Sequence, residues 1–172
     1  MLKEEIINKL KELTGHEFVE LTMRGNTAIK AAVSIVSDDG QILIPEEGGW
    51  LEYKKIKDVG YVKCDDAVID LDDLKQRLST TEYAAFLYQN PGGYFAEQPM
   101  QEIYEICKEN NCLVILDVSG SIGTKLCNGT YADIIVSSFG RWKPVNAEIG
   151  GFISYKDERL MNKITVDEVE DE

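Results

Sequence analysis

The stretch Cys112-Leu113-Val114-Ile115-Leu116-Asp117 is the most apolar strand-like run of the sequence, and an acid directly follows its last apolar residue. A continuous apolar run of this length is typical of a strand that is covered on both faces of a parallel sheet. Two similar runs lie before and after it, at 84–88 and at 133–137. The three runs together predict the centre of a buried, mostly parallel sheet.

Strand and helix patterns alternate along the rest of the chain, which predicts an α/β fold. Four further strands are predicted, at 18–22, 41–44, 61–64 and 151–155. Helices are predicted at 2–13, from Gly25 to Val36, at 53–57, at 70–78 with Asp70 as the N-cap, and at 98–110, with a turn at Asp38-Asp39-Gly40. No helical pattern joins the last two strands, so we expect the seventh strand to run antiparallel. The predicted architecture is three-layer α/β/α around a seven-stranded, mostly parallel sheet.

The composition of the 172 residues fits one globular domain, with 44% hydrophobic and 28% charged residues. The formal net charge of -13 argues against a nucleic-acid partner, because binding to a phosphate backbone requires a basic face. No apolar stretch reaches the roughly 20 residues of a membrane span. The charged N-terminus lacks the apolar region of a secretion signal. We therefore expect a cytoplasmic protein without a membrane partner.

The chain has four cysteines, Cys64, Cys107, Cys112 and Cys127, and its one histidine is His16. No two cysteines have the CxxC spacing, so the sequence does not predict a zinc site. We expect buried, reduced thiols, as in other cytosolic proteins, and no metal centre.

Lys143, Asp117 and Asn90 each follow a separate predicted strand. In an open α/β sheet, strand ends of this kind converge on one crevice. Such a crevice suits pyridoxal phosphate (PLP), which needs an amine for a Schiff base and a carboxylate for its pyridinium nitrogen. Trp50, after two glycines, would either stack on a flat ligand or anchor the following helix. Each of the other three residues also has a structural explanation when it is taken alone. Lys143 could be a solvated loop lysine, Asp117 a helix cap or a buried hydrogen-bonded acid, and Asn90 part of an Asn-Pro-Gly turn.

Candidate anion ligands lie at two turns. Gly25-Asn26-Thr27 joins a predicted strand to a predicted helix, where free N–H groups, the helix dipole and the Thr27 hydroxyl would attract a phosphate. Ser137 ends the sixth strand, and Ser138 and Arg141 follow it; together they offer two hydroxyl groups and a guanidinium fork.

The order and spacing of these residues resemble the large, cofactor-binding domain of fold-type I PLP enzymes, the aspartate aminotransferase superfamily. The resemblance covers residues 18–155 and is strongest to the DegT/DnrJ/EryC1 aminotransferases. In that group a Ser-Phe pair leads to the Schiff-base lysine, and a Glu and paired glycines follow, as in Ser138-Phe139-Gly140-Arg141-Trp142-Lys143 and Glu148-Ile149-Gly150-Gly151. The resemblance implies aminotransferase chemistry, PLP as the cofactor and an active site formed across a homodimer interface.

The resemblance also implies a role for each matching residue. Lys143 would form the Schiff base and shuttle the proton, and Asp117 would pair with the pyridinium nitrogen, so these two are the catalytic candidates. Asn90 would contact the phenolic oxygen of the ring, and Trp50 would stack on the ring. The full set of cofactor-binding candidates is Gly25, Asn26, Thr27, Trp50, Asn90, Asp117, Ser138, Arg141 and Lys143.

The chain also departs from the pattern of these enzymes. We expect residues 1–160 to form a single large domain with an N-terminal helix at 1–15 and residues 161–172 to form an acidic tail, without the C-terminal small domain of these enzymes. One expectation is a minimal or split aminotransferase that acts on a small-molecule amine or amino acid, as a homodimer or with a separate small-domain subunit. The alternative is a catalytically degenerate PLP-fold protein that serves as a binding or regulatory subunit. A generic nucleotide-binding domain is disfavoured, because neither GxGxxG nor GxxxxGK[ST] occurs.

Overall fold

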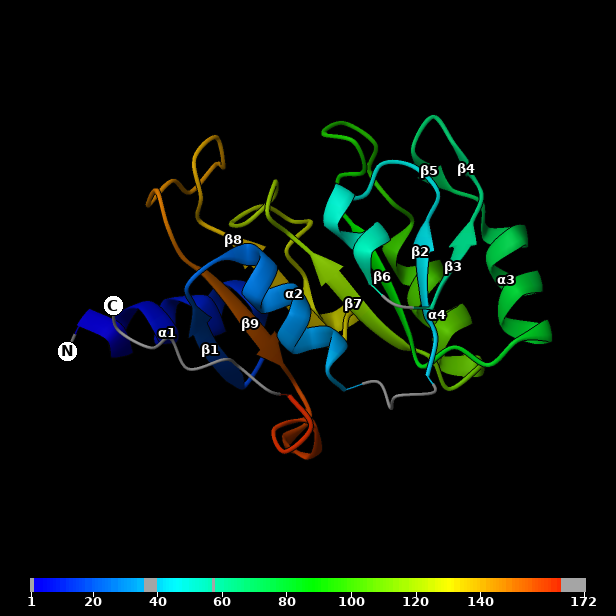
Figure 1. The fold of residues 1–172 in the computed structure, drawn as a ribbon. Helices are drawn as coiled ribbons and strands as arrows, with labels where there is room; N and C mark the ends of the chain where they lie inside the picture. The colour runs from blue at the N-terminus through cyan, green and yellow to red at the C-terminus, as the bar shows by residue number, and fades with distance from the viewer. Residues whose placement is uncertain (1, 36–39, 57, 165–172) are drawn as a thin grey trace.

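The structure is a computed structural model that describes residues 2–35, 40–56 and 58–164. Its centre is a seven-stranded sheet with the order β1-β9-β8-β7-β6-β2-β3 (Figure 1). The strands are β1 (Phe18–Thr22), β2 (Ile42–Pro45), β3 (Val59–Val62), β6 (Ala85–Gln89), β7 (Leu113–Asp117), β8 (Ile134–Ser138) and β9 (Gly151–Tyr155). Neighbouring strands are parallel except where β9 pairs with β1 and β8. The predicted mostly parallel sheet with an antiparallel last strand is confirmed.

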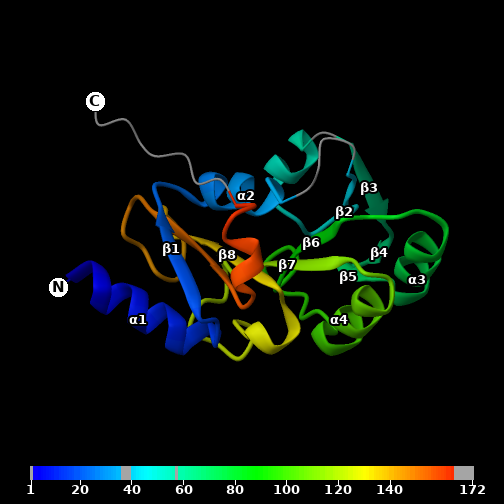
Figure 2. The ribbon, with the colours of Figure 1, turned by 90° about the horizontal axis from the view of Figure 1, so that it is seen from below.

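Helices cover both faces of this sheet, with α2 on one side and α1 and α4 on the other (Figure 2), which gives the predicted three layers. The helices are α1 (Leu2–Thr14), α2 (Gly25–Val33), α3 (Leu71–Thr80) and α4 (Met100–Glu109), and the short 3-10 turns are η1 (Leu51–Lys55), η2 (Gly129–Tyr131) and η3 (Glu158–Leu160). Side chains of α1, α3 and α4 join one buried cluster, whereas those of α2, η1 and η3 join a second cluster across the sheet.

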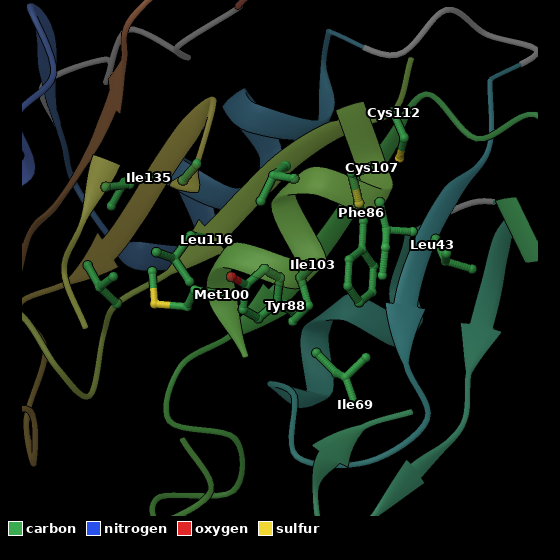
Figure 3. Close-up of a cluster of buried hydrophobic side chains, with 14 of the residues drawn as sticks. Leu43, Ile69, Phe86, Tyr88, Met100, Ile103, Cys107, Cys112, Leu116 and Ile135 are labelled. Atoms are coloured by element: carbon green, nitrogen blue, oxygen red, sulfur yellow. The ribbon is translucent and has the colours of Figure 1, made fainter. Parts of the chain in front are cut away.

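The central strands contribute to both clusters, because successive side chains of a strand point to opposite faces. In β6, Phe86 and Tyr88 belong to the cluster of α3 and α4, whereas Ala85 and Leu87 belong to the cluster of α2. Figure 3 shows the first cluster, where the rings of Phe86 and Tyr88 lie beside Ile103 of α4. Burial on both faces explains why these strands are continuous apolar runs in the sequence.

The predicted helices and strands are present, and most of their boundaries differ from the prediction by one to three residues. The helix expected from Gly25 to Val36 ends at Val33, and Ser34 and Ile35 form a turn. The strand expected at 61–64 is β3, and the helix expected at 53–57 is the 3-10 turn η1. Helix α4 begins at Met100 rather than at residue 98, because Pro99 disfavours a helical conformation for Gln98. Helix α3 begins as predicted, with the Asp70 carboxylate accepting hydrogen bonds from two backbone N–H groups of its first turn, at 2.9 and 3.1 Å.

A small hairpin between β3 and α3 was not predicted. It pairs β4 (Cys64–Asp65) with β5 (Val68–Ile69), and its turn residues Asp66 and Ala67 have φ values of 48° and 66°. Such a turn usually carries glycine or asparagine, and the Asp-Ala pair gives no such signal in the sequence. The left-handed Ala67 is held from outside the hairpin, since its N–H donates to Glu47 Oε1 at 3.0 Å.

Some expectations concern residues outside the described ranges: the end of the second predicted helix at Val36, the turn at Asp38-Asp39, Lys57, and residues 165–172 of the acidic tail. Within the described ranges, no helix combines the length and the apolar character needed to cross a bilayer. In the same ranges, no three His, Cys, Asp or Glu side chains gather as a metal site would require. All four cysteines are free thiols.

Candidate active site

The carboxyl ends of the parallel strands meet at the upper edge of the sheet in Figure 1, where β9 begins. A pocket of about 170 Å³ lies at this edge. Six residues nominated from the sequence line it together: Gly25, Asn26, Trp50, Asp117, Ser138 and Lys143. The fold therefore brings four separate segments of the chain to one place. Of the three residues in the strand-end argument, Lys143 and Asp117 line the pocket and Asn90 does not.

Asp117 is the last residue of β7, lines the pocket and is 2% exposed. Its Oδ1 accepts a hydrogen bond from the Ser119 backbone N–H at 2.8 Å, and its Oδ2 accepts one from the Tyr53 hydroxyl at 2.6 Å. Burying a carboxylate is costly unless such donors compensate it. Burial and the adjacent Asp117 charge raise the pKa of Tyr53 well above its ordinary value, so this hydroxyl stays protonated and remains a donor.

Lys143 faces Trp50 across the pocket. Its Nζ lies 5.5 Å from the centroid of the Trp50 ring, within the range of a cation–π interaction. The Trp50 indole N–H in turn donates to Asn26 Oδ1 at 3.2 Å. Trp50 is 41% exposed, whereas Tyr53 is the buried aromatic residue of the following turn. Of the two explanations for Trp50, the structure therefore favours a pocket wall over a buried anchor.

Helix α2 begins at Gly25, directly against the end of β8. A Cβ at position 25 would lie only 2.6 Å from the Cβ of Ser138, so this approach requires glycine. The Ser138 Oγ accepts a hydrogen bond from the Gly140 N–H at 3.1 Å, and the Ser138 N–H donates to Ser119 Oγ at 3.0 Å. A helix N-terminus packed against serine hydroxyls is an arrangement that suits an anion.

Other nominated residues do not line the pocket. Thr27 is half-buried in the first turn of α2, and Arg141 is exposed in the loop that leads to Lys143. Ser137 is buried. Asn90 is fully buried, and its Oδ1 accepts a hydrogen bond from the Gln98 N–H at 3.1 Å. The Asn90 Nδ2 has no hydrogen-bond partner among the residues that the structure describes.

Gln89 lines the pocket at the end of β6, where the sequence had pointed to Asn90. Gln89 pairs in register with Asp117 on the adjacent strand, so the two side chains lie on the same face of the sheet. Asn90 belongs to the opposite face because side chains alternate along a strand. At this strand end the side chain that lines the pocket is that of Gln89, one position before the nominated Asn90.

Tyr53 and Ser119 were also not nominated, although both hydrogen-bond to Asp117. Ser119 had a local signal, since aspartates often accept a hydrogen bond from the backbone N–H two residues on. Tyr53 had none, because it is separated from Asp117 by 64 positions. Arg24 and Glu148 complete the charged lining.

The strand order, the antiparallel last strand and the pocket at the strand ends define a domain of the fold-type I PLP transferase class. Within this class, the chain belongs to the DegT/DnrJ/EryC1/StrS aminotransferase family, whose family model matches residues 60–169. A search of curated proteins found no match.

Solved structures share this fold at low sequence identity. The SepCysS–SepCysE N-terminal domain complex superposes with a TM-score of 0.80 at 16% identity, over 98% of this chain and 49% of that one. NtdA of Bacillus subtilis with bound cofactor PMP gives 0.80 at 24% identity, over 93% and 38%. Alanine–glyoxylate aminotransferase of Nostoc sp. gives 0.74 at 20% identity, over 94% and 46%. The chain therefore spans less than half of the length of these structures, and the likeness concerns the fold alone.

Proposed function

We propose that this chain is the PLP-binding domain of an aminotransferase, in which Lys143 forms a Schiff base with the cofactor. The observation that carries the proposal is the convergence of an amine, a carboxylate and an aromatic ring on one pocket, from Lys143, Asp117 and Trp50. Membership of an aminotransferase family supports it. Pyridoxal phosphate is the cofactor that the family and the PLP- and PMP-bound structural neighbours support.

The residues of the pocket fit this cofactor. Asp117 supplies a buried carboxylate for the ring nitrogen, and Trp50 supplies a flat wall for the ring. Gly25, Asn26 and Ser138 would hold the phosphate at the N-terminus of α2. Because Gly25 has no Cβ, the helix begins close to Ser138 at the end of β8.

Nominated residues that do not line the pocket are placed around it. Thr27, in the first turn of α2, and Arg141, two residues before Lys143, are additional phosphate ligands. For the phenolic oxygen of the ring we propose Gln89, which shares the pocket with Asp117. Asn90 is the second candidate for that contact, because its Nδ2 lacks a partner among the described residues.

The cofactor and the residues of the pocket would contribute different parts of the chemistry. When bound, the cofactor supplies an electron sink for the pair left at the substrate Cα. The Lys143 Nζ would take the proton from that carbon and deliver it to the cofactor carbon that carries the aldehyde group. Asp117 would hold a proton at the ring nitrogen by electrostatic stabilisation, and Trp50 would cover the ring and exclude water.

The substrate and the assembly are proposals of the same kind. The substrate is a small-molecule amine or amino acid, and the assembly is a homodimer or a complex with a separate small-domain subunit. Exposed apolar side chains in the loops after β6 and β8 support an assembly, since Tyr94 is 80%, Phe95 74% and Trp142 95% exposed. The free thiols fit a reducing compartment such as the cytoplasm.

A second candidate function is a PLP-fold binding or regulatory subunit without turnover. One observation favours it: residues 141–149 are exposed apart from Lys143, so the loop around the lysine is open. Such a site would retain a ligand and yet leave the reacting atoms accessible to water.

The test is to titrate the 172-residue chain with PLP and to record the visible absorbance of the Schiff base. Borohydride reduction and peptide mapping then identify the modified lysine. Lys143→Ala should abolish the reducible band, while Lys9→Ala, on the exposed face of α1, should leave it unchanged. A band that persists in Lys143→Ala, or a folded wild-type chain without a band, would contradict the proposal.

Amine substrates distinguish the two functions once the band is established. An aminotransferase should convert the bound PLP to PMP when amino donors are supplied, which is visible as a loss of the Schiff-base absorbance. Retention of the band with every donor tested would favour the binding subunit.

A further inference from the structure

Tyr53 connects the turn that follows Trp50 to the acid at the end of β7. It is the third residue of η1 and is 1% exposed. Its hydroxyl lies 2.6 Å from Asp117 Oδ2. Neither the nominated site residues nor the motif around Lys143 includes it, so its place beside Asp117 needs its own explanation.

We propose that Tyr53 is a positioning residue that acts through Asp117, with its hydroxyl holding the carboxylate in the orientation that receives the ring nitrogen of the cofactor. This inference rests on the proposed function, because it requires a ring nitrogen beside Asp117. It deepens that function by assigning an electrostatic role to a residue that lies outside the pocket lining.

The hydrogen bonds of Asp117 support this role. A carboxylate turns about its Cβ–Cγ bond unless both oxygens are held, and here Ser119 N–H holds Oδ1 at 2.8 Å while Tyr53 holds Oδ2 at 2.6 Å. The Tyr53 distance lies in the short range of charge-assisted O–H···O⁻ bonds. An ionised carboxylate has about four acceptor sites, so sites remain for a third donor.

The packing of Tyr53 shows that its hydroxyl is placed independently of Asp117. The ring belongs to the buried cluster of α2. The Gly49 backbone lies against the ring, since a Cβ at Gly49 would be 2.9 Å from Tyr53 Cδ2. The Tyr53 N–H donates to the Trp50 carbonyl at 3.0 Å, which fixes the turn. A ring locked in this way can impose an orientation on the carboxylate instead of following it.

A purely structural explanation is that the same bond ties η1 to β7. Loss of the hydroxyl would then lower stability and weaken every ligand of the pocket to a similar extent. The positioning role predicts a different result, in which the loss is confined to ligands that carry a ring nitrogen.

The experiment uses two ligands that do not form a Schiff base with Lys143. They are pyridoxamine 5'-phosphate (PMP) and its 1-deaza analogue, in which a CH group replaces the ring nitrogen. Calorimetry on the full chain measures both affinities for the wild type, for Tyr53→Phe and for Tyr155→Phe. Tyr155 is the matched control, because its hydroxyl donates to Glu20 Oε1, also at 2.6 Å, at the far end of β9.

We expect Tyr53→Phe to bind PMP about tenfold more weakly, as for the loss of one hydrogen bond to a charged group. Its affinity for the 1-deaza analogue should change by less than about twofold, which also shows that the variant is folded. Tyr155→Phe should bind both ligands like the wild type.

Equal losses for the two ligands, or no loss for PMP, would overturn the inference and leave the proposed function intact. A wild-type chain that binds neither ligand would overturn both.

Discussion

Gly25 and Ser138 are packed so closely that a Cβ on residue 25 would lie 2.6 Å from the Cβ of Ser138. The contact joins the start of α2 to the end of β8, two elements that are far apart in the sequence. Both residues line the pocket. The contact between Gly25 and Ser138 therefore shapes the pocket and also packs α2 against β8.

Replacement of Gly25 by alanine should disturb fold and site together. We expect Gly25→Ala to lower the free energy of unfolding by about 1–3 kcal/mol, because the new methyl group overpacks a backbone-level contact. PLP affinity should fall as well, since helix and strand must separate. Urea denaturation and PLP titration measure the two effects.

Gly120→Ala is the matched control for that substitution. A Cβ at position 120 would meet nothing closer than Pro91 Cδ at 3.9 Å. Its effect on stability should stay within about 0.5 kcal/mol. Equal effects at the two positions would show that the close approach of α2 to β8 is not what requires Gly25.

Tyr88 carries a hydroxyl that its surroundings do not satisfy. The side chain is fully buried, and its OH has no hydrogen-bond partner among the described residues. In Figure 3 it lies among apolar side chains that include Met100 and Ile103. Burial raises the pKa of Tyr88, so the group stays a neutral, unpaired donor.

Tyr88→Phe should therefore stabilise the protein, by about 1 kcal/mol, because the desolvation cost of the unpaired hydroxyl disappears. Tyr155→Phe should have the opposite sign, since the Tyr155 hydroxyl donates to Glu20. Thermal and urea unfolding of both variants check the prediction. Destabilisation by Tyr88→Phe would mean that the hydroxyl has a partner, such as a buried water molecule.

His16 should make stability depend on pH. It is 2% exposed, its Nε2–H donates to the carbonyls of Gly129 and Ala132 at 3.3 and 3.2 Å, and its Nδ1 accepts from Ser154 Oγ at 3.0 Å. Burial, with a smaller contribution from the nearby Lys156 charge, lowers the pKa of His16 below 6.5, against the weaker opposing effect of its hydrogen bonds. The folded state thus favours neutral imidazole.

As the pH falls below 6.5, the unfolded chain takes up this proton before the folded chain does. The stability contributed by neutral His16 is therefore complete above that pH and is lost as the pH falls toward the lowered pKa. Because His16 is the chain's one histidine, urea unfolding between about pH 7.5 and pH 5.5 isolates its effect. His16→Gln should flatten the profile, and an unchanged slope in this variant would contradict the assignment.

The sequence was a good guide to the sheet and a poorer one to turns. Strands such as β7 and β9 are buried on both faces, so their residues form mostly apolar runs. The ends of these runs in the sequence lie within one residue of the ends of the strands. The hairpin of β4 and β5 was missed because Asp66 and Ala67 adopt left-handed conformations without glycine or asparagine. That turn is supported by a hydrogen bond from Ala67 to Glu47, which lies twenty positions away and so outside any local sequence pattern.

For the site, the sequence located strand ends better than side-chain directions. Lys143, Asp117 and Ser138 could be nominated because each follows an apolar run, and all three line the pocket. The face of the sheet to which a side chain points depends on the register of its strand. A single sequence does not fix that register to within one residue, and a shift of one residue moves the side chain to the other face. Tyr53 could not be predicted from the sequence for another reason, because its partner Asp117 becomes a neighbour only through tertiary packing.

The side chains of Gln89 and Asn90 belong to opposite faces of the sheet, which leads to a further prediction. Gln89→Ala should reduce PLP affinity, because Gln89 lines the pocket beside Asp117. Its effect on stability should stay below about 1 kcal/mol, because the substitution removes only the part-buried hydrogen bond from Gln89 Nε2 to the Pro91 carbonyl. Asn90→Ala should instead cost about 1 kcal/mol of stability, because it leaves the buried Gln98 N–H without its acceptor. PLP titration and urea unfolding of the two variants separate the effects. A larger loss of affinity in a folded Asn90→Ala than in Gln89→Ala would show that Asn90 reaches the ligand after all, and that the strand end rearranges when the cofactor binds.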